Sequence, residues 1–168
     1  MWIGHWVIGE GFYIGLSVAI WIEGTGALQR HDHSAHYFLN HLTIQRLSAL
    51  VVFVAASIAQ YICHAHLYSL RAKAISSADP QKPRYSLPQH TLFRFTHTPH
   101  YFTECLIYLA LSVLTAPVGY VVNKTILCAM IFVVVNLGVT AHGTAVWYEQ
   151  KFGKQATRGR ARMIPLMY

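Results

Sequence analysis

Four long apolar stretches divide the chain, and each is close to the length that a helix needs to cross a membrane. They run from about residue 1 to 22, 42 to 70, 100 to 116 and 125 to 147. About 20 apolar residues in a helix cover the hydrocarbon core of a bilayer. Isolated polar residues, such as Glu10 and Arg46, interrupt them. The pattern predicts an all-α integral membrane bundle of about four transmembrane helices, with residues 1–168 forming a single membrane domain.

The basic residues gather after the second and fourth stretches, which orients the predicted helices. Ten of the 13 bases lie there: Arg71, Lys73, Lys82, Arg84, Arg94, Lys151, Lys154, Arg158, Arg160 and Arg162. Loops rich in lysine and arginine stay on the cytoplasmic side of a membrane. We therefore expect the segment 71–99 and a basic C-terminal tail after residue 150 to face the cytoplasm.

The composition agrees with a membrane protein that has anionic partners. Only 11% of the 168 residues are charged, whereas a soluble domain carries about 25%. The net charge is +7, and the bases lie between apolar stretches. The charge therefore favours lipid headgroups or a phosphorylated small molecule over nucleic acid.

Neither a metal motif nor a nucleotide-binding loop is present in the sequence. The segment 30–36 is rich in histidine but has no ordered ligand spacing, and His64 and His66 point to different faces of a helix. We therefore predict that the chain holds no metal. The glycine patterns that bind dinucleotides or phosphates are absent as well. Helix faces and the tail would have to hold any nucleotide.

Polar side chains inside the apolar stretches are the candidates for function, because burying them in lipid is costly. Gln60, His64 and Arg71 follow one another at spacings of four and seven, which places them on one stripe of a helix. His100 and Glu104 are one turn apart on the next helix. Structural roles also remain open: helix packing for Gln60, snorkelling for Arg71 and a dipole contact for Glu104.

These residues lie in blocks that resemble, in the same order, the C-terminal domain of the steroid 5α-reductase family, and most nearly its polyprenol (polyprenal) reductase branch. Four blocks carry the resemblance: Gln60–His64 with Leu70–Arg71, Pro99–Glu104, Trp147–Phe152 and Arg160–Pro165. The segment Gly9–Tyr13 is similar to the family helix that precedes them. The resemblance implies a multi-pass reductase of the endoplasmic reticulum membrane that uses NADPH.

The resemblance also implies a role for seven positions of this chain. The implied cofactor-binding residues are Gln60, His64, Arg71, His100, Glu104, Tyr148 and Arg160. His100 and Glu104 would lie beside the nicotinamide half of the cofactor. Tyr148 and Arg160 would lie near its phosphates and ribose. The implied reaction is reduction of the α-isoprene double bond of a polyprenol or polyprenal, a membrane lipid, in dolichol synthesis for protein N-glycosylation.

Several alternatives remain open at this stage. A 3-oxo-5α-steroid 4-dehydrogenase would share the same blocks. An isoprenylcysteine-type membrane methyltransferase would have a similar helical layout, and two facing histidines, such as His64 and His100, could hold a haem.

The chain also departs from the family pattern. His64 and Ala145 replace an acid and a histidine, and residues 155–157 replace Tyr-Pro. The family's earlier spans, which carry a tyrosine and an acid that polarise the substrate carbonyl, have no counterpart here. We therefore expect a C-terminal, cofactor-binding half that is inactive alone.

Overall fold

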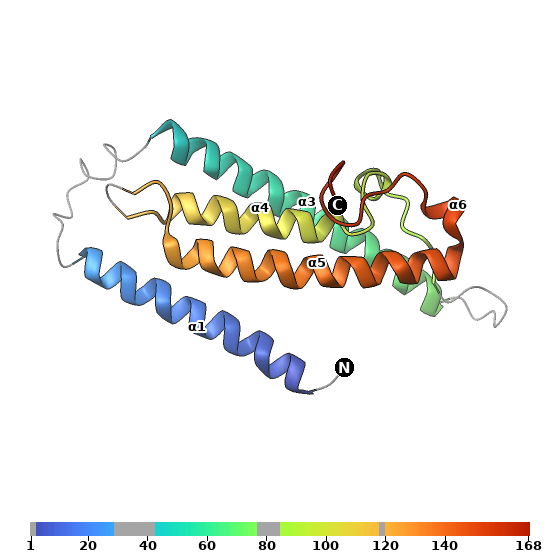
Figure 1. Ribbon diagram of the computed structural model, residues 1–168, viewed down its shortest axis with the longest axis horizontal. Helices are drawn as coiled ribbons and strands as arrows, with labels where there is room; N and C mark the ends of the chain where they lie inside the picture. The colour runs from blue at the N-terminus through green and yellow to red at the C-terminus, as the bar shows by residue number, and fades with distance from the viewer. Residues whose placement is uncertain (1–2, 29–42, 77–84, 118–119) are drawn as a thin grey trace. The chain divides into compact units, whose positions relative to one another are not determined.

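The computed structural model describes residues 3–28, 43–76, 85–117 and 120–168, which form helices joined by irregular segments (Figure 1). The elements are α1 (Ile3–Leu28), α3 (Ile44–Ser76), the 3-10 helix η1 (Thr91–Arg94), α4 (Pro99–Leu114), α5 (Lys124–Phe152) and α6 (Lys154–Thr157). Within these ranges, the only extended pairing is an isolated parallel bridge between Thr96 and Ala161. The all-α prediction is confirmed.

Two of the described helices are long and apolar enough to cross a membrane. They are α3, with 33 residues, and α5, with 29. With 16 residues, α4 is too short to meet the same criterion. The expected spans are therefore supported for α3 and α5, while four spans and a cytoplasmic tail stay predictions.

Local sequence signals explain where α4 and α5 begin and end. Proline occupies the first position of α4, where its missing N–H costs nothing. Asn123 caps α5, because its side-chain Oδ1 accepts a hydrogen bond from the Ile126 N–H at 3.1 Å. After α5, Gly153 adopts a φ of 85°, a backbone conformation that glycine adopts at little cost and that α-helices do not contain.

The chain forms two compact units, and residues 1–52 with 108–132 make up the first. In this unit the carboxylate of Glu23 on α1 accepts hydrogen bonds from Asn123 Nδ2 at 2.9 Å and from Thr125 Oγ1 at 2.8 Å. The guanidinium of Arg46 donates to the carbonyl of Ala116 at 2.9 Å. Polar contacts of this kind connect α1 to the start of α5, and α3 to the end of α4.

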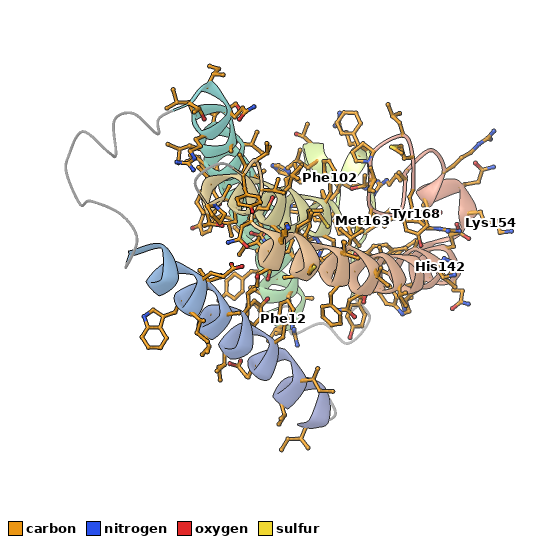
Figure 2. The ribbon with its side chains drawn as sticks, turned by 60° about the vertical axis from the view of Figure 1, so that its left-hand side comes forward. Phe12, Phe102, His142, Lys154, Met163 and Tyr168 are labelled. Atoms are coloured by element: carbon orange, nitrogen blue, oxygen red, sulfur yellow. The ribbon has the colours of Figure 1, made fainter. Side chains whose placement is uncertain are left out.

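The second unit comprises residues 53–107 and 133–168 and contains every predicted site residue. Its buried side chains include Cys63 on α3, Phe93 on η1 and Met163 in the tail, each no more than 1% exposed. Figure 2 labels Met163 and Tyr168 on this tail. The tail pairs with the segment before α4 through backbone hydrogen bonds, among them His97 N to Ala161 O at 2.9 Å. The tail therefore completes the core of this unit.

Candidate functional site

Two polar residues on α3 pair with two polar residues on α4. Gln60 Nε2 donates a hydrogen bond to Glu104 Oε2. One turn further along α3, the ring of His64 meets that of His100 edge to face, with 5.2 Å between ring centroids. The Glu104 carboxylate thus has a hydrogen-bond partner, Gln60. This partner is itself one of the predicted cofactor-binding residues.

The spacing in the sequence accounts for this double pairing. Residues four apart lie above one another on a helix face, so Gln60 and His64 form one column on α3. His100 and Glu104 form a matching column on α4, which runs in the opposite direction. Gln60 therefore meets Glu104, and His64 meets His100, as expected for two neighbouring antiparallel helices. We call these four side chains the paired cluster.

The paired cluster continues toward α5 and the tail through aromatic side chains. The ring of Tyr101 lies 4.3 Å from that of His100. Tyr148 on α5 interacts electrostatically with Tyr101 and with Arg160 of the tail. The guanidinium of Arg160 also donates to the carbonyl of Pro88 at 3.0 Å. These interactions connect six of the seven predicted residues within the second unit.

Arg71 is the predicted residue that lies apart from this group. It follows His64 by seven residues, near the end of α3, and its side chain is exposed. An exposed guanidinium at a helix end suits either a phosphate contact or snorkelling into the headgroup region, so both interpretations from the sequence stay open.

His97 belongs to the site, although the sequence analysis did not single it out. Its side chain is only 3% exposed, and its ring lies 5.7 Å from that of Tyr148. Burial lowers the pKa of His97, Arg160 lowers it further and Glu149 partly opposes the shift. His97 is therefore neutral at neutral pH. The tail that covers His97 follows more than sixty residues later in the chain. The sequence around His97 therefore does not indicate that this side chain is buried.

Several buried polar atoms around the site have no hydrogen-bond partner among the described residues. They are His66 Nε2, His90 Nδ1, Thr96 Oγ1, His97 Nδ1 and His100 Nδ1. Most buried polar atoms in proteins are bonded to protein or to ordered water. Free donors and acceptors at this density therefore mark a place where water or a polar ligand can bind.

The described residues include no group of three or more histidine, cysteine, aspartate or glutamate side chains that could hold a metal ion. The histidine-rich segment 30–36 lies outside the described residues, so the absence of a metal stays a prediction. The direct contact of the His64 and His100 rings leaves no room for a porphyrin between them. This geometry disfavours the haem alternative for that pair.

Comparisons with known proteins agree with the resemblance of the sequence blocks. A family model described as 3-oxo-5-alpha-steroid 4-dehydrogenase matches residues 13–168. Polyprenal reductase from Drosophila melanogaster is 26% identical over 165 residues, which are 98% of this chain and 48% of that protein. Polyprenal reductase from Xenopus laevis is 29% identical over 168 residues, which cover 98% of this chain and 49% of that protein.

A plant relative matches a shorter part of the chain. Polyprenal reductase 2 from Oryza sativa subsp. indica is 32% identical over 121 residues, covering 70% of this chain and 30% of that protein. The chain spans about half the length of the animal relatives that it matches. No solved structure matches it.

Proposed function

The chain belongs to the 3-oxo-5-alpha-steroid 4-dehydrogenase family, and from this membership we propose that it is the cofactor-binding part of an NADPH-dependent reductase. We propose that the substrate is a polyprenal or polyprenol whose α-isoprene double bond is reduced, as a step of dolichol synthesis at the endoplasmic reticulum membrane. The relatives named polyprenal reductase support this substrate over a steroid.

The paired cluster is the observation that carries the proposal. An amide, a carboxylate and two imidazoles lie on facing helices, at positions that the family resemblance assigns to the cofactor. Helix packing alone would be served by small apolar residues, and ionisable groups within membrane segments are commonly functional. Their concentration at one level of α3 and α4 therefore favours a binding site.

The hydrogen-bonding capacity of the paired cluster suits a nicotinamide. The carboxamide of that ring has an NH₂ donor and a C=O acceptor. An ionised carboxylate has about four acceptor positions, so Glu104 can accept from the ligand while it accepts from Gln60. The partnerless Nδ1 of His100 can, in one tautomer, donate to the carboxamide oxygen. Both polar ends of the carboxamide would thus be satisfied.

Two arginines are suited to the phosphates of the cofactor. Arg71 is exposed near the end of α3. Arg160 is half-buried and commits one nitrogen to the Pro88 carbonyl, which leaves further guanidinium donors free. Guanidinium groups bind phosphates through two parallel hydrogen bonds. We propose that these arginines, with Tyr148, hold the phosphate and ribose half.

NADPH, when bound, supplies the hydride for reduction of the double bond. We propose that the residues of this chain bind and orient the cofactor. Glu104 fixes the orientation of the carboxamide, and so decides which face of the ring is exposed. The apolar surfaces of α3 and α5 would keep the isoprenoid chain within the plane of the membrane.

The decisive experiment measures NADPH binding to the whole chain in detergent by the fluorescence of the cofactor. We expect Glu104→Ala to weaken binding by about tenfold or more, because a hydrogen bond to a charged group contributes about 1.5–3 kcal/mol. Glu149→Ala is the matched control, since Glu149 is an exposed acid outside the predicted set.

Other ligands separate the alternatives in the same assay. Tighter binding of S-adenosylmethionine than of NADPH would favour the methyltransferase. A larger thermal stabilisation by a 4-ene-3-oxo steroid than by polyprenal, with NADPH present, would favour the steroid substrate. Equal NADPH affinity in Glu104→Ala and Glu149→Ala would contradict the proposed role of the paired cluster.

A further inference from the structure

Residues 163–168 of the tail form a closed turn that is fixed to the side of α5. The backbone carbonyl of Tyr168 accepts hydrogen bonds from Met163 N at 2.6 Å and Ile164 N at 2.7 Å. The phenol of Tyr168 donates to the carbonyl of Gly138 at 3.2 Å. Gly138 precedes Tyr148 by ten residues, or about 15 Å along the helix. Figure 1 shows the tail turning back from α6.

Leu166 is an unusual residue for the tip of this turn. Its φ is 65°, a conformation that glycine and asparagine adopt more readily than leucine, and its side chain is fully exposed at 101%. Met167 beside it is 84% exposed. The turn itself gains nothing from apolar side chains here. Strain combined with an exposed apolar surface is a reason to look for a binding partner.

The apolar tip lies beside an apolar face of a helix that can cross a membrane. Val135 and Val139, on either side of Gly138 in the sequence, are 62% and 70% exposed. The hydrogen bond from Tyr168 to Gly138 therefore holds the turn against this face of α5. The hydrocarbon of a bilayer is the environment in which all these side chains are stable.

A cavity of about 470 Å³ lies next to the turn and contains two guanidinium groups. Its lining includes Arg160, Arg162, Leu166, Met167 and Tyr168. No acidic side chain occurs among these described residues. The Arg162 guanidinium lies 5.2 Å from the centroid of the Tyr168 ring, which helps to orient it. The cavity therefore favours an anion with an apolar part.

We propose that this cavity binds the phosphate headgroup of an anionic membrane phospholipid, with the acyl chains lying along Leu166 and Met167. A soluble nucleotide would also suit the guanidinium groups, but it would not explain the exposed apolar rim next to α5. The inference rests on Arg162, which is outside the predicted cofactor set. It goes beyond the proposed reductase function, which assigns the neighbouring Arg160 of the same cavity to the cofactor, so NADPH is included as a competitor in the test.

Native mass spectrometry of the whole chain in detergent tests the proposal, with added phosphatidylglycerol as the probe and phosphatidylcholine as its uncharged comparison. We expect phosphatidylglycerol to be retained preferentially, and Arg162→Gln to reduce its retention by about tenfold, as the loss of a charged hydrogen bond predicts. Arg158→Gln is the matched control, because it removes the same charge from an exposed arginine that does not line the cavity. Equal losses in both variants would show a general charge effect and overturn the proposal.

A second variant guards against misfolding of Arg162→Gln. Leu166→Asn removes the apolar side chain and places at φ 65° a residue that tolerates this conformation, so the turn is expected to persist. We expect it, too, to lower retention of phosphatidylglycerol. Unchanged retention in this variant, equal retention of phosphatidylcholine, or displacement of the lipid by NADPH or inorganic phosphate would each overturn the proposal.

Discussion

At the scale of the residue, His97 shows how a side chain acquires its properties from a distant part of the chain. Its imidazole lies near Tyr148 of α5 and Arg160 of the tail, and its Nδ1 has no partner among the described residues. Burial and the neighbouring guanidinium both disfavour the imidazolium form, so the pKa of His97 lies below its ordinary value. The folded position of the tail therefore favours a neutral imidazole at this position.

This shift predicts that stability falls as the solution is acidified. The unfolded chain takes up a proton on His97 at a higher pH than the folded chain does, so protonation favours unfolding. The loss of stability begins as the pH falls through the ordinary histidine pKa of about 6.5. It ends below the lowered pKa that His97 has in the folded chain. Thermal unfolding of the whole chain in detergent, from about pH 8 to about pH 5, measures it.

His97→Gln is expected to weaken this pH dependence, because glutamine does not titrate. His142→Gln is the matched control, since His142 is an exposed histidine on α5. If His97→Gln unfolds with the same pH dependence as the parent chain, the argument from burial is wrong.

The sequence predicted which of these residues share a helix face, but it did not predict their contacts. The stripe through Gln60 and His64 and the column of His100 and Glu104 both follow from helix periodicity, so the structure could place them as pairs. Which pairs form depends on the relative level of α3 and α4, and periodicity carries no information about it. Whether these residues bind NADPH stays a prediction.

At the scale of the element, the junction between the tail and the start of α4 orders the second unit. The Thr98 hydroxyl donates to the carbonyl of Arg162 at 2.8 Å, and the Thr98 N–H donates to the same oxygen at 3.2 Å. Phe95 accepts from Ala161 N at 2.9 Å. A short extended pairing therefore attaches the tail where a helix begins.

Thr98→Val should loosen the tail while it leaves the helices intact. The substitution keeps the shape of the side chain and removes a single hydrogen bond, so the expected cost is about 1 kcal/mol. We expect trypsin to cut faster at Arg158 and Arg160, as measured by limited proteolysis of the chain in detergent. Thr115→Val serves as the control, because the Thr115 hydroxyl donates to the Leu111 carbonyl of α4 and not to the tail. Equal cleavage rates in the two variants would argue against the junction.

The apolar pattern predicted the long helices and left the short ones undetected. It placed the second stretch up to residue 70 and the fourth up to residue 147, whereas α3 ends at Ser76 and α5 at Phe152. Hydropathy marks the apolar part of a helix, and the polar last turns of α3 and α5 extend past it. The four-residue elements η1 and α6 have no periodicity of their own, since tertiary contacts fix segments this short.

At the scale of the whole molecule, the second unit determines which segments share one side of the membrane. The Thr96–Ala161 bridge and the His97 to Ala161 hydrogen bond require the segment before α4 and the tail to be on the same side. The distribution of lysine and arginine in the sequence predicts the same arrangement. The structure therefore supports the pairing of these two regions, while the cytoplasmic assignment stays a prediction.

Labelling of introduced cysteines checks this topology. We expect a membrane-impermeant maleimide to modify Lys73→Cys and Lys154→Cys from one side of sealed vesicles. Lys124→Cys, at the first residue of α5, should react only from the opposite side if α5 crosses the bilayer. The unsubstituted chain gives the background from Cys63, Cys105 and Cys128. Modification of Lys73→Cys and Lys154→Cys from opposite sides would rule out the arrangement.

The pairing of residues 95–98 with 161–162 has a consequence for biosynthesis. A nascent chain that has emerged only as far as Phe152 possesses α1, α3, α4 and α5, but nothing yet covers Thr96 and His97. Because the two partners are about 64 positions apart, closing this contact carries the entropic cost of a long loop. The unit therefore becomes complete only after residues 161–162 have emerged. A chain released before that point would leave Thr96 and His97 uncovered, and quality control could recognise it by these exposed polar groups.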